Sequence, residues 1–220
     1  MTSGFRYDTT YQRWVRDERA TNSMTTITTM TGEQYTAWPV CFSVLEQKGL
    51  KSYAVEDVQK ELAQGKCTLI DIRPSEEYER GHVEGSVNVP LFIKAVSQTK
   101  GMRLKRIAFA FLAMTPRERN PTFLADCEAA LGGKKPRKPF YVMCSQGGSM
   151  DRIVTSNKLD GQGKPYTKRF EDPERDFGRE SRSLKAAFEL YNAGFTNLKH
   201  VRGGYQRWIK EELPIVAYKK

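Results

Sequence analysis

Residues 140–148 read Phe-Tyr-Val-Met-Cys-Ser-Gln-Gly-Gly, an apolar run that ends at one thiol and a glycine-rich turn. The apolar run predicts a buried strand, which presents Cys144 at its end. Backbone N–H groups in such a turn stabilise a thiolate, and glycine lets the backbone close around the sulfur. Free cysteines are also often inert buried side chains, so a structural role for Cys144 stays open on this stretch alone.

Strands and helices are expected to alternate on both sides of this stretch. Apolar residues at helical spacing predict helices at residues 54–62, 122–131 and 181–192, and a final helix opens at Gly203. Short apolar runs predict strands at residues 67–73, 86–90 and 197–201. We also expect a short polar helix at residues 76–80 and a longer one at residues 94–114, basic in its first half and apolar in its second. The alternation indicates an α/β domain with a mostly parallel sheet of about five strands and helices on both faces.

Two segments fall outside this alternating pattern. Residues 1–41 show no apolar periodicity and are interpreted as a polar N-terminal extension, so the domain is expected at residues 42–220. Residues 149–178 are polar, contain scattered Gly and Pro, and are interpreted as a long surface insertion. Neither the extension nor the basic stretch at residues 100–106 is expected to add to a core, and both are expected to act in association with a partner or a membrane surface.

Composition argues against several kinds of site. The chain has 220 residues and a net charge of +10, which suits one domain with extensions and an anionic partner or surface. Its four cysteines show no C-x-x-C spacing and it has two histidines, which argues against a zinc site and a disulfide framework. Aromatic residues are not interleaved with the basic ones, which argues against nucleic-acid binding. No apolar run approaches the roughly 18 residues of a membrane span, so no transmembrane segment is expected.

Several short motifs in a fixed order carry a family resemblance. They are Leu69-Ile70-Asp71-Ile72-Arg73, Gly81-His82-Val83, Asn88-Val89-Pro90, the Cys144 turn, Ser181-Arg182-Ser183, and Gly203-Gly204 with Trp208. Together, from about residue 50 to residue 216, they resemble a rhodanese domain. Residues 106–114, Asn120-Pro121 and the long insertion before Ser181 are similar, more narrowly, to the chloroplast rhodanese-like proteins of plants and algae, several of which are thylakoid-associated. This resemblance implies a chloroplast location, either stromal or thylakoid-associated.

The resemblance implies that Cys144 accepts sulfane sulfur as a persulfide and passes it to a nucleophilic acceptor, as in a thiosulfate sulfurtransferase. The turn residues that would bind the substrate are Ser145, Gln146, Gly147, Gly148 and Ser149. In active members of the family, an Arg is the last residue of a six-residue loop that starts at the Cys. Here the sixth residue is Ser149. Arg182 can therefore act as the catalytic Arg only if the chain returns to the cysteine turn after the insertion. No metal or other cofactor is implied, and the expected partners are a sulfur donor and a sulfur acceptor.

Other motif residues are expected to have structural roles. Asp71 and Arg73 can form an ion pair that fixes a strand end, and His82 can organise the turn between its neighbours. Phosphatases with a C-x5-R motif need an Arg six positions after the Cys. That position here is Met150, so phosphatase chemistry is set aside.

A second function stays open beside the enzyme. It is a catalytically silent rhodanese-like module, bound as a subunit of a plastid membrane or ribosomal assembly. The extension, the insertion and the net charge favour the bound subunit, whereas the retained Cys144 and its turn favour the sulfurtransferase. The two differ in whether Cys144 is open to solvent with N–H groups and Arg182 around it, or covered by the insertion.

Overall fold

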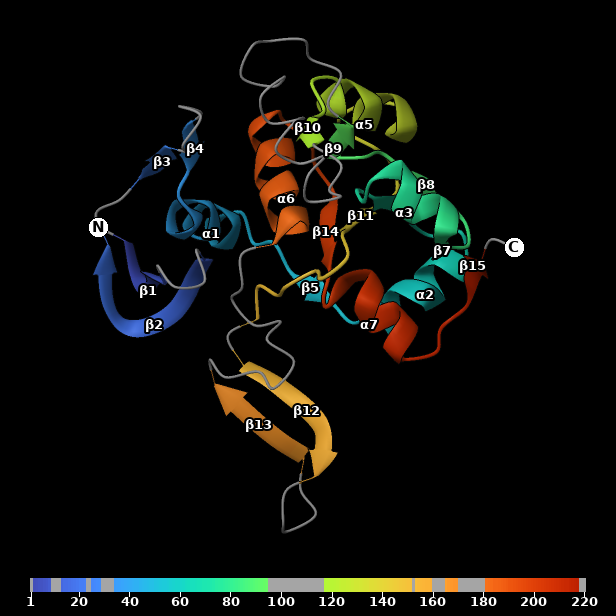
Figure 1. The fold of residues 1–220 in the computed structure, drawn as a ribbon. Helices are drawn as coiled ribbons and strands as arrows, with labels where there is room; N and C mark the ends of the chain where they lie inside the picture. Colours follow the sequence, from blue (N-terminus) through green and yellow to red (C-terminus); the bar gives the residue numbers. More distant parts are fainter. Residues whose placement is uncertain are drawn as a thin grey trace, which may run out of the picture.

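A five-stranded parallel sheet forms the centre of the computed structural model, which describes residues 2–8, 13–22, 25–28, 34–94, 117–151, 153–159, 165–169 and 181–217. In spatial order the strands are β5 (Ser52–Tyr53), β14 (Leu198–Val201), β11 (Phe140–Met143), β6 (Thr68–Asp71) and β8 (Ser86–Asn88). Each neighbouring pair runs parallel. The predicted α/β fold, with helices around a parallel sheet, is therefore confirmed (Figure 1).

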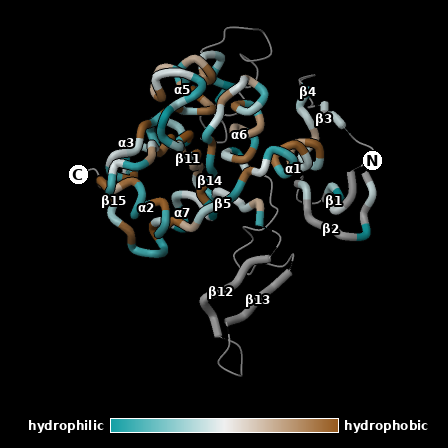
Figure 2. The backbone as a smooth tube through the Cα atoms, turned by 180° about the vertical axis from the view of Figure 1, so that it is seen from behind, coloured by the Kyte–Doolittle hydropathy of each residue, from teal (hydrophilic) through white to brown (hydrophobic). Residues whose placement is uncertain are grey.

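Both faces of the sheet are buried, which explains why β11 is apolar throughout. Phe140 and Val142 pack into one hydrophobic cluster and Tyr141 and Met143 into the other, because successive side chains of a strand point to opposite faces. The first cluster includes residues of α1 (Trp38–Gln47), α5 (Phe123–Leu131) and α6 (Arg182–Asn192). The second includes residues of α2 (Val55–Ala63) and α7 (Gly204–Lys210). Figure 2 shows hydrophobic segments on β11 and on α1.

Most of the predicted elements are present. The helices expected at residues 54–62, 76–80, 122–131, 181–192 and after Gly203 are confirmed as α2, α3 (Ser75–Arg80), α5, α6 and α7. The strands expected at residues 67–73, 86–90 and 197–201 are confirmed as β6, β8 and β14. A short strand, β7 (Gly81–Val83), follows α3 and pairs with β15 (Ile215–Ala217).

The segment expected as a helix at residues 94–114 differs at its start. Lys94 ends the strand β9 (Phe92–Lys94), which pairs antiparallel with β10 (Arg117–Arg119). The remainder of that segment, including the basic stretch at residues 100–106, lies outside the described residues.

The insertion contains a ribbon of two strands. β12 (Ile153–Leu159) and β13 (Pro165–Arg169) pair antiparallel, and Figure 1 shows them set apart from the central sheet. Neither strand has a regular alternation of apolar and polar residues, and for that reason the sequence predicted only an insertion there.

The N-terminal residues contribute to the core, so the expectation that they carry too little apolar surface is wrong. β1 (Thr2–Asp8) pairs with β2 (Arg13–Asn22), and β3 (Thr26–Thr28) pairs with β4 (Gln34–Thr36). Phe5 and Trp14 are buried in the same cluster as Trp38 and Phe42 of α1. The Phe5 ring lies 5.1 Å from the Phe42 ring and 6.3 Å from the Trp38 ring. The predicted domain boundary at residue 41 falls within α1, and the division into extension and domain stays a prediction.

A buried ion pair fixes the end of β6. Arg73 Nη2 lies 2.7 Å from Asp71 Oδ2, and it donates a second hydrogen bond of 2.9 Å to the carbonyl oxygen of Gly81 in β7. The guanidinium carbon lies 3.5 Å from the centre of the Tyr205 ring in α7. The expected pairing of Asp71 and Arg73 is thus present, and it connects β6 to both β7 and α7.

Candidate active site

Cys144 follows the last residue of β11, at the edge of the sheet where the parallel strands end. The turn after it rests on the start of α7. The Tyr205 N–H donates to the Cys144 carbonyl and the Gln206 N–H to the Ser145 carbonyl, both at 2.9 Å. Because the first N–H groups of a helix have no partner within the helix, these two bonds satisfy them and hold the turn in place.

Two glycines allow this close contact between the turn and the helix. A Cβ atom on Gly147 would lie 2.2 Å from the backbone N of Gly204, and one on Gly204 would lie 2.3 Å from the Cys144 carbonyl oxygen. Both residues also have positive φ, +67° and +60°, a conformation that favours glycine. Gly147 in the turn and Gly204 in α7 are therefore required by backbone packing.

The sulfur of Cys144 has polar neighbours. The Gly147 N–H donates to Sγ at 3.3 Å, and the hydroxyl oxygen of Ser183 lies 3.3 Å from Sγ. The side chain is 2% exposed, yet it lines a cavity of about 430 Å³. A sulfur with donors on the protein side and a cavity on the other can react with a small molecule that enters the cavity.

The chain returns from the insertion directly to the cysteine turn. Ser181 is the N-cap of α6, and its hydroxyl accepts a hydrogen bond from the Leu184 N–H at 3.2 Å. Arg182 Nη2 then lies 3.5 Å from Ser145 Oγ, and Ser145 Oγ donates to Glu77 at 3.2 Å. Arg182 thus lies beside Ser145, which precedes it by 37 positions, and Ser183 lies beside Cys144, which precedes it by 39. The role of Arg182 in catalysis stays a prediction.

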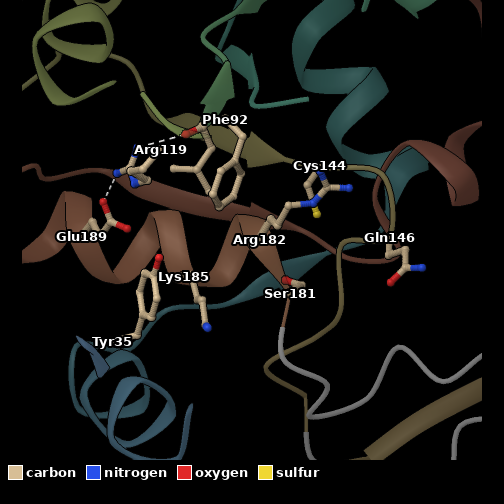
Figure 3. Close-up of a pocket in the computed structure, with 10 residues that line it drawn as sticks. Tyr35, Phe92, Arg119, Cys144, Gln146, Ser181, Arg182, Lys185 and Glu189 are labelled. Atoms are coloured by element: carbon tan, nitrogen blue, oxygen red, sulfur yellow. Dashed lines mark hydrogen bonds and ion pairs between the residues drawn. The ribbon is translucent and has the colours of Figure 1, made fainter. Parts of the chain in front are cut away.

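The walls of the cavity come from distant parts of the chain. Its lining residues are Tyr35, Leu91, Phe92, Arg119, Cys144, Gln146, Ser181, Arg182, Lys185 and Glu189. Figure 3 shows the Arg182 side chain extending toward Cys144, and Arg119 paired with Glu189 at the other end.

The other predicted site residues lie in different surroundings. Gln146 is exposed and lines the cavity, whereas Gly148 and Ser149 are buried beside the turn. Ser149 Oγ donates to Asp151 at 2.8 Å, and Gly148 accepts from the Gly203 N–H at 3.2 Å. These contacts hold the far end of the turn rather than the sulfur.

His82 is placed away from the cysteine. Its ring stacks on Tyr78 with 4.0 Å between centroids, and Nδ1 lies 3.0 Å from the Tyr78 carbonyl oxygen. A role in organising the turn between α3 and β7 is consistent with these contacts.

The sequence analysis missed one buried polar group beside the site. His200, in β14, is fully buried, and its Nε2 lies 2.9 Å from Ser183 Oγ. Burial lowers the pKa of His200 to about 3, so the ring is neutral near pH 7. The signal was present in the sequence, because a histidine near the end of the last parallel strand lies at the same sheet edge as Cys144.

The remaining cysteines are buried in different places. Burial raises the pKa of Cys67 to about 11 and that of Cys127 to about 12, which leaves both thiols protonated near pH 7. Cys41 Sγ lies 3.7 Å from the Thr36 carbonyl oxygen.

No helix in the described ranges has the length and apolar character needed to cross a bilayer.

Comparisons with known proteins show the family of the chain. The family model for the rhodanese-like domain matches residues 54–167. The chain is 31% identical over 179 residues to rhodanese-like domain-containing protein 14, chloroplastic, of Arabidopsis thaliana, which covers 81% of this chain and 70% of that protein. It is 27% identical over 148 residues to thiosulfate sulfurtransferase 16, chloroplastic, of the same plant, covering 67% of this chain and 78% of that one. It is 25% identical over 172 residues to thiosulfate sulfurtransferase 18, also of Arabidopsis thaliana, covering 74% and 85%.

Proposed function

Because the chain belongs to the rhodanese-like domain family, we propose that it is a sulfurtransferase that moves sulfane sulfur through a persulfide on Cys144. The observation that carries this proposal is the position of the sulfur. It lies at the wall of a cavity, with the Gly147 N–H directed at it and with Arg182 lining the same cavity. Two relatives are named as thiosulfate sulfurtransferases, which supports the same class of reaction.

The proposed reaction has two displacement steps. The Cys144 thiolate attacks the outer sulfur of a donor such as thiosulfate; a bond forms between the two sulfurs, and sulfite leaves with the electron pair of the broken S–S bond. An acceptor nucleophile then attacks the outer sulfur of the persulfide, and the Cys144 thiolate leaves. No net oxidation occurs, because the sulfane sulfur moves between two nucleophiles.

The cavity supplies positive charge for the anions in both steps. Arg182 and Lys185 line it on α6, and Arg119 lines it at the end where it pairs with Glu189. A guanidinium close to the reacting sulfur offers paired N–H donors to an oxyanion such as sulfite. We assign Arg182 to binding the anionic part of the donor and the Gly147 N–H to holding the sulfur, whereas Gly148 and Ser149 hold the far end of the turn.

We propose a plastid location for this activity, since two of the relatives are named as chloroplastic. A catalytically silent subunit of a thylakoid or other plastid assembly is the second candidate, favoured by the net charge of +10. A fluorescent fusion of the full chain found outside plastids would contradict the location.

Replacement of the nucleophile tests the function. Wild-type protein treated with thiosulfate is expected to gain one sulfur atom on the peptide that contains Cys144, and to pass it to cyanide as thiocyanate. Cys144→Ser should abolish both, because a hydroxyl of similar size cannot carry a persulfide. Cys41→Ser is the matched control, since serine can keep the hydrogen bond to the Thr36 carbonyl.

Sulfur transfer retained by Cys144→Ser would remove this residue from the mechanism. No persulfide on the wild-type protein, with thiosulfate or with small-molecule persulfides as donors, would favour the silent subunit instead.

A further inference from the structure

A buried chain of polar side chains, which the two displacement steps do not use, ends at the sulfur of Cys144. Ser183 Oγ lies 3.3 Å from Cys144 Sγ and 2.9 Å from His200 Nε2. On the other side of the ring, Ser52 Oγ lies 2.9 Å from His200 Nδ1. Ser183 and His200 are both 0% exposed, and the three residues come from α6, β14 and β5.

We infer that the proton of the His200 ring lies on Nε2, the tautomer in which Ser52 donates to Nδ1 and Nε2 donates to Ser183. The Met150 N–H donates to Ser52 Oγ at 2.8 Å, and the Ser52 hydroxyl proton points at Nδ1 in this tautomer. A neutral ring that accepts at Nδ1 donates from Nε2. The low pKa that burial gives His200 keeps the ring in this neutral form near pH 7.

Ser183 can serve two acceptors with one proton. Its hydroxyl donates to the Gly147 carbonyl at 3.1 Å, and Sγ of Cys144 lies at a similar distance of 3.3 Å. When Cys144 loses its proton, the Ser183 hydroxyl can rotate from the Gly147 carbonyl to the thiolate, because a charged sulfur is the stronger acceptor. The thiolate then has two donors, the Gly147 N–H and the Ser183 O–H.

We propose that Ser183 is a catalytic residue that donates a hydrogen bond to the Cys144 thiolate, and that His200 is a positioning residue that holds the Ser183 hydroxyl in place through a tautomer fixed by Ser52. The thiol proton itself leaves to water in the cavity, and neither Ser183 nor His200 takes it up. This inference rests on the proposed function for the choice of Cys144 as nucleophile.

Charged groups near this chain set the background for its pH dependence. They are Arg182 and Glu77, which both contact Ser145, and the ion pair of Asp151 with Arg202 beside Ser149. None of these charged side chains bonds to Ser52, Ser183 or His200 among the contacts of the described residues.

Alkylation of Cys144 by iodoacetamide tests the inference without turnover. In Ser183→Ala, the alkylation rate of Cys144 at pH 7 should fall about tenfold, because the thiolate loses one charge-assisted hydrogen bond. The midpoint of the rate-against-pH profile should move to higher pH. His200→Leu should act in the same direction, and Ser52→Ala should give a smaller slowing of about threefold, because it only releases the tautomer.

A double variant separates this role from loose packing. Because Ser52 acts through Ser183, Ser52→Ala should change the rate in the wild-type background and have no further effect in Ser183→Ala. Ser86→Ala in β8 is the matched control; its hydroxyl donates to the Val83 carbonyl at 2.6 Å, and its loss should leave the Cys144 rate unchanged. Thermal unfolding of each variant shows whether it is folded. If His200→Leu does not fold, Ser52→Ala still tests the role of His200, because it changes only the partner of Nδ1.

The possible results have different meanings. A Ser183→Ala rate within twofold of wild type, or equal Ser52→Ala effects in both backgrounds, would overturn the inference. Slowing in Ser183→Ala alone, with His200→Leu and Ser52→Ala unchanged, would overturn the role of His200. If these rates behave as expected but no sulfur donor loads Cys144, the proposed function fails and the inference about the thiolate stands.

Discussion

The four cysteines differ in chemistry although all are buried. We expect iodoacetamide near pH 7.5 to modify Cys144 before Cys67 or Cys127. Burial raises the pKa of the last two to about 11 and about 12, so their reactive thiolate forms are scarce, whereas Cys144 borders a cavity. Mass mapping after brief treatment of the folded protein measures the order. Faster modification of Cys67 or Cys127 would contradict the assignment.

His200 is expected to make the fold sensitive to mild acid. Burial lowers the pKa of its ring from 6.5 to about 3, so only the unfolded chain takes up this proton as the pH falls below 6.5. The unfolded state then binds more protons than the folded state, and the free energy of unfolding should fall by about 2 kcal/mol between pH 7 and pH 5 from this group. Urea denaturation at both pH values measures the change.

His200→Gln removes the titrating group and should flatten this pH dependence, whereas His82→Gln should keep it. The same slope in wild type and in His200→Gln would show that another group is responsible.

At the residue scale, motifs predicted some of the site and topology supplied the rest. Cys144 and Arg182 were found from their place in short ordered motifs. The contact of Ser183 with His200 was not, because a polar residue inside a strand gives no sign of its partner until the order of the strands is known. The presence of Tyr35 in the cavity also depends on the path of the N-terminal segment, which has no periodic pattern.

Among the elements, the contact between the cysteine turn and α7 depends on the absence of side chains at two glycines. Gly147→Ala is expected to lower the free energy of unfolding by about 2–4 kcal/mol, since the new Cβ would overlap the backbone of Gly204 at a positive φ. Gly132→Ala is the matched control, because its φ of +69° is similar but no atom lies within 4 Å of the added Cβ. If urea denaturation shows the same loss of unfolding free energy for Gly147→Ala and Gly132→Ala, the positive φ and not the contact with α7 causes the loss.

Apart from the short polar helix α3, the elements that could be predicted have continuous or periodic apolar residues. The apolar run at residues 140–143 predicted β11, because a strand of this sheet is buried on both faces. The helical spacing of Leu184, Ala187, Phe188 and Tyr191 predicted α6. β12 and β13 pair through backbone hydrogen bonds and carry no such pattern. β9 was missed because its three residues precede a basic run that suggested a helix.

For the molecule as a whole, the N-terminal hairpin is expected to unfold together with the domain. Phe5→Ala should lower the free energy of unfolding by about 3–5 kcal/mol, since the ring is buried against Trp38 and Phe42 of α1. Tyr7→Ala, in the same strand but 37% exposed, should cost about 1 kcal/mol. Urea denaturation measures both. A small effect of Phe5→Ala, similar to that of Tyr7→Ala, would show that residues 1–41 are an independent extension.

The order of the strands has a consequence for how the protein is made. β14 is the last strand of the sheet to be synthesised, yet it lies between β5 and β11, and it brings His200 to Ser52 across 148 residues of chain. A nascent chain on the ribosome therefore displays Cys144 well before α6 and β14 emerge, with a gap in its sheet where β14 will insert. A ribosome that stalls within the insertion would hold a thiol without Arg182, Ser183 or His200. The surroundings of the Cys144 sulfur are thus completed late in synthesis, after β14 and the start of α7 have left the ribosome.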